Sequence, residues 1–149
     1  EAAIDAVRPG NDFNAPHRAA VAAATKGLVE LGIVPGPLSR ALKSGHTEAL
    51  FMGPTGHWLG LDVHDVGEYK LGGEWRVFEP GMVTTVEPGL FIPVDAPKID
   101  AKYRGIAVRI EDDILVTRGE PEVLSAALPK EPAQIERLVG SGNDGTLNG

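Results

Sequence analysis

Residues 106–116 read IAVRIEDDILV and predict a β-strand that is apolar on one face and charged on the other. The apolar positions 106, 108 and 110 alternate with Arg109 and Glu111. Successive side chains of a strand point to opposite faces, so these two sets separate. We expect the apolar face to pack into a core and the face with Arg109 and Glu111 to meet solvent or a polar site.

A second strand is predicted in residues 81–89, which read GMVTTVEPG and end with Pro88-Gly89. Glu87 closes its apolar part. A carboxylate among apolar strand residues is costly unless something compensates it. Glu87 is therefore either a strand-end charge that faces water or part of a polar site.

The remaining elements are predicted to be helices and turns. Apolar steps and turn residues indicate helices over residues 1–8, stopped by Pro9-Gly10, and from Asn14, the expected cap, to Gly32. We expect Val21, Ala24, Leu28 and Leu31 to form the apolar stripe of the second helix. Short helices are expected after Pro37 and over Glu131–Val139. Residues 140–149, rich in Gly, Asn and Ser, predict a flexible tail.

The composition is that of an ordinary globular protein with many turns. The 149 residues are 42% hydrophobic and 23% charged, and include 19 Gly and 12 Pro. A net charge of −7 argues against a nucleic-acid partner. No apolar run approaches the ~20 residues that a membrane span needs. The lack of cysteine excludes disulfides and thiol chemistry and is consistent with the cytoplasm.

Two histidines, His57 and His64, lie in a stretch too rich in glycine for a stable helix, residues 56–67. A lone histidine is more often structural, but a pair among glycines favours a functional site. We expect the other two histidines, His17 and His46, to lie on the surface without a role.

One imidazole and two carboxylates form a chemically coherent set. They suit Mn²⁺, Co²⁺, Zn²⁺ or Fe²⁺, and oxygen-rich sites lean towards Mn²⁺. Two such ions about 3.5–4 Å apart can share a carboxylate and activate water for hydrolysis. The glycine-rich segments match no phosphate-binding loop.

Three motifs resemble those of the bacterial Xaa-Pro aminopeptidases, also called aminopeptidase P. They are GHWLGLDVHDVG (56–67), EPGMVTTVEPGLF (79–91) and YRGIAVRIEDDILVT (103–117). The resemblance extends over residues 1–139, because VRPG (7–10) and GLVELGI (27–33) are similar to the family's preceding helices.

The resemblance implies an α+β pita-bread fold, in which two halves, each with helices packed on an antiparallel sheet, enclose a dinuclear metal site. Residues 1–139 would form the C-terminal part of this catalytic domain. The family's five metal ligands are two aspartates, one histidine and two glutamates. By motif, the metal ligands here are His57, Glu87 and Glu111, with Glu111 bridging both ions.

The resemblance also implies cleavage between an N-terminal residue and a following proline by a hydroxide that bridges the metals. Glu87 would handle the proton passed to the leaving nitrogen. His64 would bind substrate and donate a hydrogen bond to the developing oxyanion. Arg109 would join a hydrogen-bond relay, and Phe91 would line the proline pocket with it.

Three departures from the family pattern are evident. Phe91 replaces a tyrosine, and Gly53 replaces a histidine four residues before the metal ligand. Both aspartate ligands would precede Glu1, where the chain starts without an initiator Met. We therefore expect a piece of a longer protein, inactive alone, whose partners are the missing N-terminal half, a second copy in a homo-oligomer, and a peptide with proline second.

Two alternatives stay open. A prolidase, which cleaves Xaa-Pro dipeptides, shares the same ligands, although Trp58 and the EPGLF and YRGI motifs favour aminopeptidase P. A non-catalytic pita-bread module would bind peptides or partners without metal. Retention of all three ligand positions argues against it, whereas Phe91 and Gly53 argue mildly for it.

Overall fold

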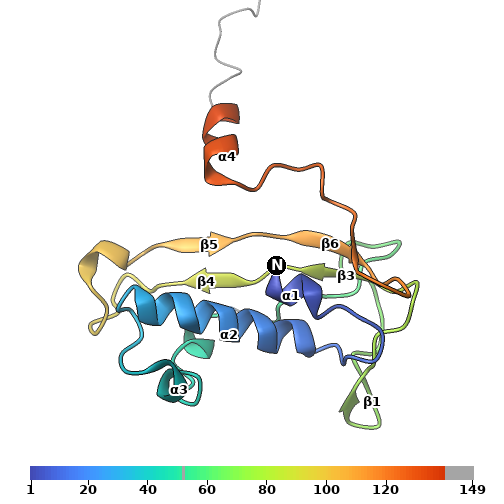
Figure 1. Cartoon of the computed structure of the whole chain (residues 1–149), viewed down its shortest axis with the longest axis horizontal. Helices are drawn as coiled ribbons and strands as arrows, with labels where there is room; N and C mark the ends of the chain where they lie inside the picture. Colours follow the sequence, from blue (N-terminus) through green and yellow to red (C-terminus); the bar gives the residue numbers. More distant parts are fainter. Residues whose placement is uncertain (52, 140–149) are drawn as a thin grey trace, which may run out of the picture.

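The computed structural model describes residues 1–51 and 53–139. Its helices are α1 (Ala2–Asp5), α2 (Ala15–Glu30), α3 (Leu38–Ala41) and α4 (Pro132–Leu138), with 3₁₀ turns at Glu48–Leu50 and Ala101–Tyr103. Its strands are β1 (Lys70–Leu71), β2 (Glu74–Trp75), β3 (Val83–Val86), β4 (Gly89–Phe91), β5 (Ala107–Arg109), β6 (Asp112–Leu115) and β7 (Glu122–Val123). Figure 1 shows α1 and α2 along the ribbon formed by β3, β4, β5 and β6, with α3 beyond α2 and β1 apart from the ribbon.

The strand pairs are antiparallel, and two of them share one register. β3 pairs with β6 from Val83↔Leu115 to Val86↔Asp112, and β4 pairs with β5 from Gly89↔Arg109 onwards. Counting one residue on from Val86↔Asp112, or two back from Gly89↔Arg109, places Glu87 opposite Glu111. The ladder is interrupted there because Pro88 has no amide N–H to donate. The predicted end of the strand at Pro88-Gly89 is a break in the hydrogen-bond ladder, and the chain forms a new strand, β4, from Gly89.

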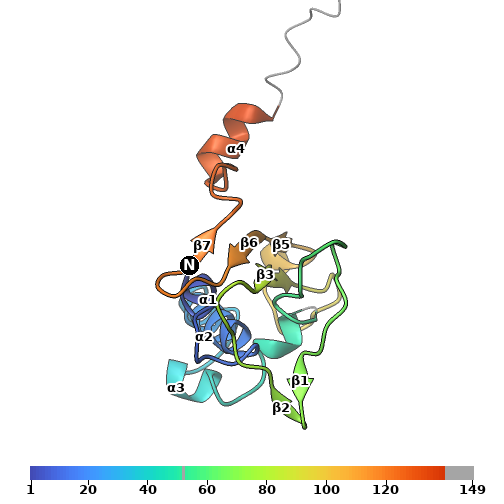
Figure 2. The ribbon, with the colours of Figure 1, turned by 90° about the vertical axis from the view of Figure 1, so that its right-hand side faces the viewer.

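Both α1 and α2 pack on one side of this ribbon (Figure 2). One core cluster joins Ala3 and Val7 of the first segment to Ala20 of α2 and to Val86 and Ile114 of the strands. Burial of this apolar surface, at roughly 25 cal/mol per Å², is what holds the helices on the sheet. The helix-bearing side is therefore apolar, and the other side is free to carry charge.

The prediction that the apolar face of residues 106–110 packs into a core is wrong for this chain. Ile106, Val108 and Ile110 are 46%, 53% and 50% exposed. Val108 and Ile110 instead line an open groove of about 260 Å³ together with alanines of α1 and α2. The alternation predicted correctly that these side chains share one face, but the described residues leave that face about half exposed.

Helix α2 follows its prediction with two corrections. Val21 and Leu28 are buried, but Leu31 is 56% exposed because the helix ends at Glu30 and Gly32 then turns the chain at φ +70°. Asn14 occupies the cap position without a capping side-chain hydrogen bond. Asp12 Oδ1 accepts from the Asn14 amide instead, at 2.9 Å.

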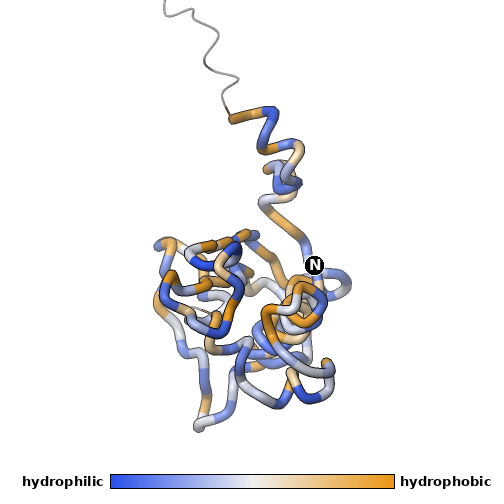
Figure 3. Tube along the Cα trace, turned by 90° about the vertical axis from the view of Figure 1, so that its left-hand side faces the viewer, coloured by the Kyte–Doolittle hydropathy of each residue, from blue (hydrophilic) through white to orange (hydrophobic). Residues whose placement is uncertain are grey.

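The C-terminal part leaves the sheet after β7. Helix α4 is one residue shorter at each end than predicted, and it has no buried residue. Figure 3 shows hydrophobic and hydrophilic residues along α4, which stands apart from the rest of the chain. The predicted tail, residues 140–149, lies outside the described residues. Among the helices described, none is long and apolar enough to cross a membrane.

Candidate metal centre

Glu87 and Glu111 meet because of the strand register. Residues directly opposite on an antiparallel pair share a face, with Cβ atoms about 4.5–5.5 Å apart. Like charges in such a pair destabilise it. The Glu87 side chain is also only 13% exposed, so its charge is poorly screened by water. The pair therefore needs a compensating positive charge.

His57 is carried to this pair by a third extended segment beside β3. The His57 carbonyl accepts from the Thr85 amide at 3.0 Å, and the Thr55 carbonyl accepts from the Glu87 amide at 2.7 Å. Gly56 makes the close approach feasible, since a Cβ there would lie 2.0 Å from the Thr85 carbonyl oxygen. The close packing of this segment against β3 thus requires a glycine at position 56.

The three predicted metal ligands converge. One ligand atom each from His57, Glu87 and Glu111 lies within 4.8 Å of the others. His57 Nε2 is 3.2 Å from Glu87 Oε1, and His57 Nδ1 is 3.0 Å from the Trp58 carbonyl oxygen. With Nδ1–H donated to that carbonyl, the Nε2 lone pair points at the carboxylates. Such second contacts orient histidine ligands in metal sites.

This donor set fits a divalent metal. An imidazole nitrogen with two carboxylates suits Mn²⁺, Fe²⁺, Co²⁺ or Zn²⁺. Three protein ligands can hold one ion and leave positions open for water. The residues present are thus sufficient for one ion, and a bridged pair would need further donors.

Thr85 is a supporting residue that sequence reasoning missed. Its hydroxyl accepts from the His57 amide at 3.0 Å and donates to Glu87 Oε1 at 3.1 Å. The side chain is 2% exposed, so the surrounding packing holds the hydroxyl in this position. The signal was available, because Thr85 precedes Glu87 by two residues and shares its face of the strand.

Arg109 and Phe91 lie beside the cluster. Arg109 Nη1 is 3.4 Å from Glu87 Oε2, and the guanidinium carbon is 5.5 Å from the centre of the Phe91 ring. Gly89 leaves room for both, since a Cβ there would lie 2.6 Å from Phe91 Cε2 and 3.0 Å from Arg109 Nε. The structure thus brings the two predicted residues together next to Glu87.

His64 stands at the open side of the centre. It is exposed, and its ring centre is 4.4 Å from that of His57 at an interplanar angle of 77°. The loop that carries it is fastened by the Asp65 amide, which donates to the Trp58 carbonyl at 3.1 Å. Gly53, where the family has a histidine, is exposed and adopts φ +82°.

The expectation that His17 lies on the surface is wrong. His17 is half-buried, its Nδ1 is 2.8 Å from Thr55 Oγ1, and its ring packs edge-on against Phe51. Burial lowers the pKa of His17 below its usual value, and the negative charge of Glu48 partly offsets this by raising the pKa. Its position reflects contacts between segments distant in sequence. His46 is exposed, as predicted.

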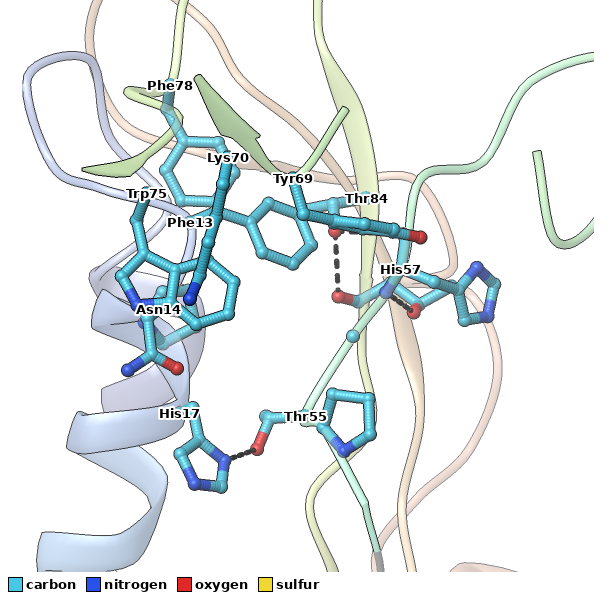
Figure 4. Close-up of a pocket in the computed structure, with 14 residues that line it drawn as sticks. Phe13, Asn14, His17, Thr55, His57, Tyr69, Lys70, Trp75, Phe78 and Thr84 are labelled. Carbon is cyan, nitrogen blue, oxygen red and sulfur yellow. Dashed lines mark hydrogen bonds between the residues drawn. The ribbon is translucent and has the colours of Figure 1, made fainter. Parts of the chain in front are cut away.

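His17 lines a mostly apolar cavity of about 410 Å³, which also has Phe13, Tyr69, Trp75 and Phe78 in its walls. Figure 4 shows this cavity between α2 and the segment of Thr55, with the His57 ring turned away from it. The cavity and the metal cluster therefore lie on different sides of the 55–57 segment.

Comparisons with known proteins show the family to which the chain is similar. Residues 1–118 match the model of metallopeptidase family M24. The Xaa-Pro aminopeptidase of Haemophilus influenzae is 44% identical over 137 residues, which cover 92% of this chain and 31% of that protein. The Escherichia coli Xaa-Pro aminopeptidase is 43% identical, covering 93% of this chain and 31% of the relative.

Solved structures show the same relationship. Aminopeptidase PepP of Pseudomonas aeruginosa superposes with a TM-score of 0.87 at 49% identity, over 95% of this chain and 32% of that one. Aminopeptidase P of E. coli with the inhibitor Pro-Leu gives 0.84 at 42% identity, over 95% and 32%. This chain spans about a third of the length of these relatives.

The predicted resemblance and the predicted fold are both confirmed. The chain is homologous to Xaa-Pro aminopeptidases, and its helices and antiparallel strands form part of the pita-bread fold. With the family match covering 118 of 149 residues, the chain belongs to metallopeptidase family M24.

Proposed function

We propose that residues 1–139 are the C-terminal part of the catalytic domain of a dinuclear metal-dependent Xaa-Pro aminopeptidase. The complete enzyme would hydrolyse the bond between an N-terminal residue and a following proline. The observation that carries the proposal is the convergence of His57, Glu87 and Glu111, from three separate segments, to within 4.8 Å. The three residues lie far apart in the sequence, so it is the fold that brings them together.

The cofactor of the proposed enzyme is a pair of divalent ions, most suitably Mn²⁺, with Co²⁺, Zn²⁺ or Fe²⁺ as alternatives. Bound ions supply an activated water for hydrolysis and polarise the scissile carbonyl. His57, Glu87 and Glu111 would hold them, with Glu111 shared between both. Opposed carboxylates at one ladder position are suited to this role because the cations relieve their repulsion.

The other residues would act on the substrate. Glu87 would accept a proton and pass it to the leaving proline nitrogen, a general acid–base role. Its hydrogen bond from Thr85 and its contact with Arg109 support this, since both orient the carboxylate. His64, exposed beside His57, is placed to donate a hydrogen bond to the developing oxyanion. Phe91 and Arg109 would line the proline pocket.

The proposed partner is the N-terminal half of the same catalytic domain, which would supply two aspartate ligands. The uncovered apolar groove supports this. Ala20, Ala23 and Ala24 form one wall, and the half-exposed Val108 and Ile110 form the other. Small residues allow close packing of a helix, and burial of the β-branched side chains would stabilise it. We further propose a cytoplasmic homo-oligomer.

The test is hydrolysis by the complete protein that contains this chain, loaded with Mn²⁺. We expect release of the N-terminal residue from Xaa-Pro-Xaa tripeptides and longer peptides, and little from matched Xaa-Ala-Xaa peptides. Cleavage restricted to Xaa-Pro dipeptides would identify a prolidase instead. Metal-independent peptide binding without hydrolysis would identify a binding module.

The matched variants are Glu111→Ala and His46→Ala. Glu111→Ala should abolish hydrolysis, because the carboxylate shared by the two ions is lost. His46→Ala should retain the wild-type rate, because His46 is exposed and its hydrogen bonds within the described residues are to Ser44. A wild-type rate in Glu111→Ala would overturn the site assignment.

A further inference from the structure

Asp112 is a buried carboxylate immediately after the proposed metal ligand Glu111. It is 7% exposed. Ser125 Oγ donates to Asp112 Oδ1 at 2.5 Å, and Lys130 Nζ lies 3.0 Å from the same oxygen. A buried carboxylate persists only when such partners compensate its lost hydration. Asp112 is thus tied to a segment that follows β7.

Lys130 is held in turn by backbone carbonyls. Its ammonium donates to the Ser125 carbonyl at 3.1 Å and to the Leu128 carbonyl at 3.2 Å. An ammonium has three protons, and these two carbonyls with Asp112 use all three. The Ser125 hydroxyl also accepts from the Asp113 amide at 3.1 Å. The result is a closed network that fastens residues 125–130 to the first two residues of β6.

Glu111 lacks the support that the other two proposed ligands have. His57 is oriented by the Trp58 carbonyl, and Glu87 by the Thr85 hydroxyl. Within residues 1–51 and 53–139, no hydrogen bond or ion pair of the Glu111 side chain is observed. Glu111 also sits at the gap between β5 and β6, so its backbone depends on the strand that starts at Asp112.

Consecutive strand residues point to opposite faces, so fixing Asp112 on the core side fixes Glu111 on the metal side. We infer that Asp112, Ser125 and Lys130 form a clamp that positions Glu111 for metal binding. This inference rests on the proposed function, because it requires Glu111 to be a ligand. Ser125 and Lys130 lie beyond residue 118, where the family match ends.

The experiment is titration of the 149-residue chain with Mn²⁺ alone, followed by the electron paramagnetic resonance of free Mn²⁺. Thermal unfolding with excess chelator measures the stability of the same variants without metal. We expect Lys130→Met and Ser125→Ala to bind Mn²⁺ about 10–100-fold more weakly, as for other residues that orient ligands. Lys130→Arg, which keeps the charge, should recover part of the affinity.

A second variant separates positioning from stability. Lys130→Met leaves a buried charge unpaired, so its folding can suffer. The double variant Asp112→Asn with Lys130→Met removes the charge as well and should unfold at a higher temperature than the single variant. Its Mn²⁺ affinity should nevertheless stay low. Arg18→Met is the matched control, because it removes an ion pair of 2.8 Å, with Asp12, that involves no residue of the clamp.

The outcomes are distinct. Weak Mn²⁺ binding by the clamp variants with wild-type affinity in Arg18→Met supports the clamp. Variants that melt earlier but bind Mn²⁺ within twofold of the wild type overturn it and leave the proposed function standing. A wild-type chain that binds no Mn²⁺ overturns the proposed metal centre, and the clamp with it.

Discussion

Glu87 and Glu111 lie directly opposite each other in the two-residue gap that interrupts the ladder between β3–β4 and β5–β6. The interruption comes from Pro88, which cannot donate a ladder hydrogen bond. The alternation of side chains places both carboxylates on the face that meets His57. The proposed metal centre therefore lies at a break in a regular sheet.

We predict that the isolated chain does not bind two metal ions tightly. His57, Glu87 and Glu111 can hold one ion, but a bridged pair in the family needs two aspartates as well. Calorimetric titration with Mn²⁺ should give one weak site per chain. Tight binding of two ions would contradict this prediction. Glu111→Ala is the control and should abolish even the weak site.

Phe91→Tyr is predicted to raise kcat/KM on Xaa-Pro peptides in the complete enzyme. The Arg109 guanidinium lies 5.5 Å from the Phe91 ring centre, so a hydroxyl on this ring would be near a strong donor. A polar group placed at developing charge contributes up to about 10²–10³ in rate. Phe91→Leu, which adds no hydroxyl, should give no increase.

The opposite outcome for Phe91→Tyr has a physical meaning as well. If the hydroxyl is buried without a partner, it costs about 1–3 kcal/mol of stability. Melting temperatures of the two variants detect this. A destabilised Phe91→Tyr with no gain in rate would show that Phe91 is an ordinary packed aromatic and not part of the proline pocket.

Gly56→Ala is predicted to destabilise the chain by about 1–3 kcal/mol or more, as overpacking does. The added Cβ would lie 2.0 Å from the Thr85 carbonyl oxygen, a backbone atom that cannot move without shifting β3. Gly27→Ala is the control, because a Cβ there meets nothing within 4 Å and the residue is helical. It should stabilise α2 by about 0.5–1 kcal/mol. Urea unfolding of both variants checks the contrast.

His17 is predicted to make stability depend on pH below neutrality. Burial lowers the pKa of His17 in the folded chain, whereas the unfolded chain has the ordinary value of about 6.5. Between the two values the unfolded state binds more protons. Stability from neutral His17 is thus present above pH ~6.5 and is lost as the pH falls towards the lowered folded value.

The measurement is urea unfolding at several pH values from 8 to 5, with chelator present. His17→Gln should lose less stability than the wild type over this range, and His46→Gln should behave as the wild type. The comparison between variants isolates His17 from the other titrating groups. An unchanged pH slope in His17→Gln would refute the prediction.

Much of the proposed site could be predicted from local patterns in the sequence. Alternation placed Arg109 and Glu111 on one face of a strand, and the structure has them on the side away from the helices. The motifs identified His57, Glu87 and Glu111, which converge. The shared face of Arg109 and Glu111 could be predicted because side-chain direction in a strand is a local property of the backbone.

Other features required the folded chain. The exposure of Ile106, Val108 and Ile110 could not be predicted, since alternation states which face a residue takes and not what covers that face. His17 was expected at the surface, but its burial depends on Thr55 and Phe51, 38 and 34 positions away in the sequence.

The sequence by itself determined the strand faces and the family, and it predicted the proposed ligands, because each of these is encoded within single segments of about a dozen residues. Only the tertiary structure decided that Glu87 lies opposite Glu111, that Thr85 bonds to both His57 and Glu87, and that Lys130 holds Asp112 behind Glu111. These relationships join segments far apart in the chain. Strand register and long-range packing, which set such distances, depend on the whole fold and not on any one segment.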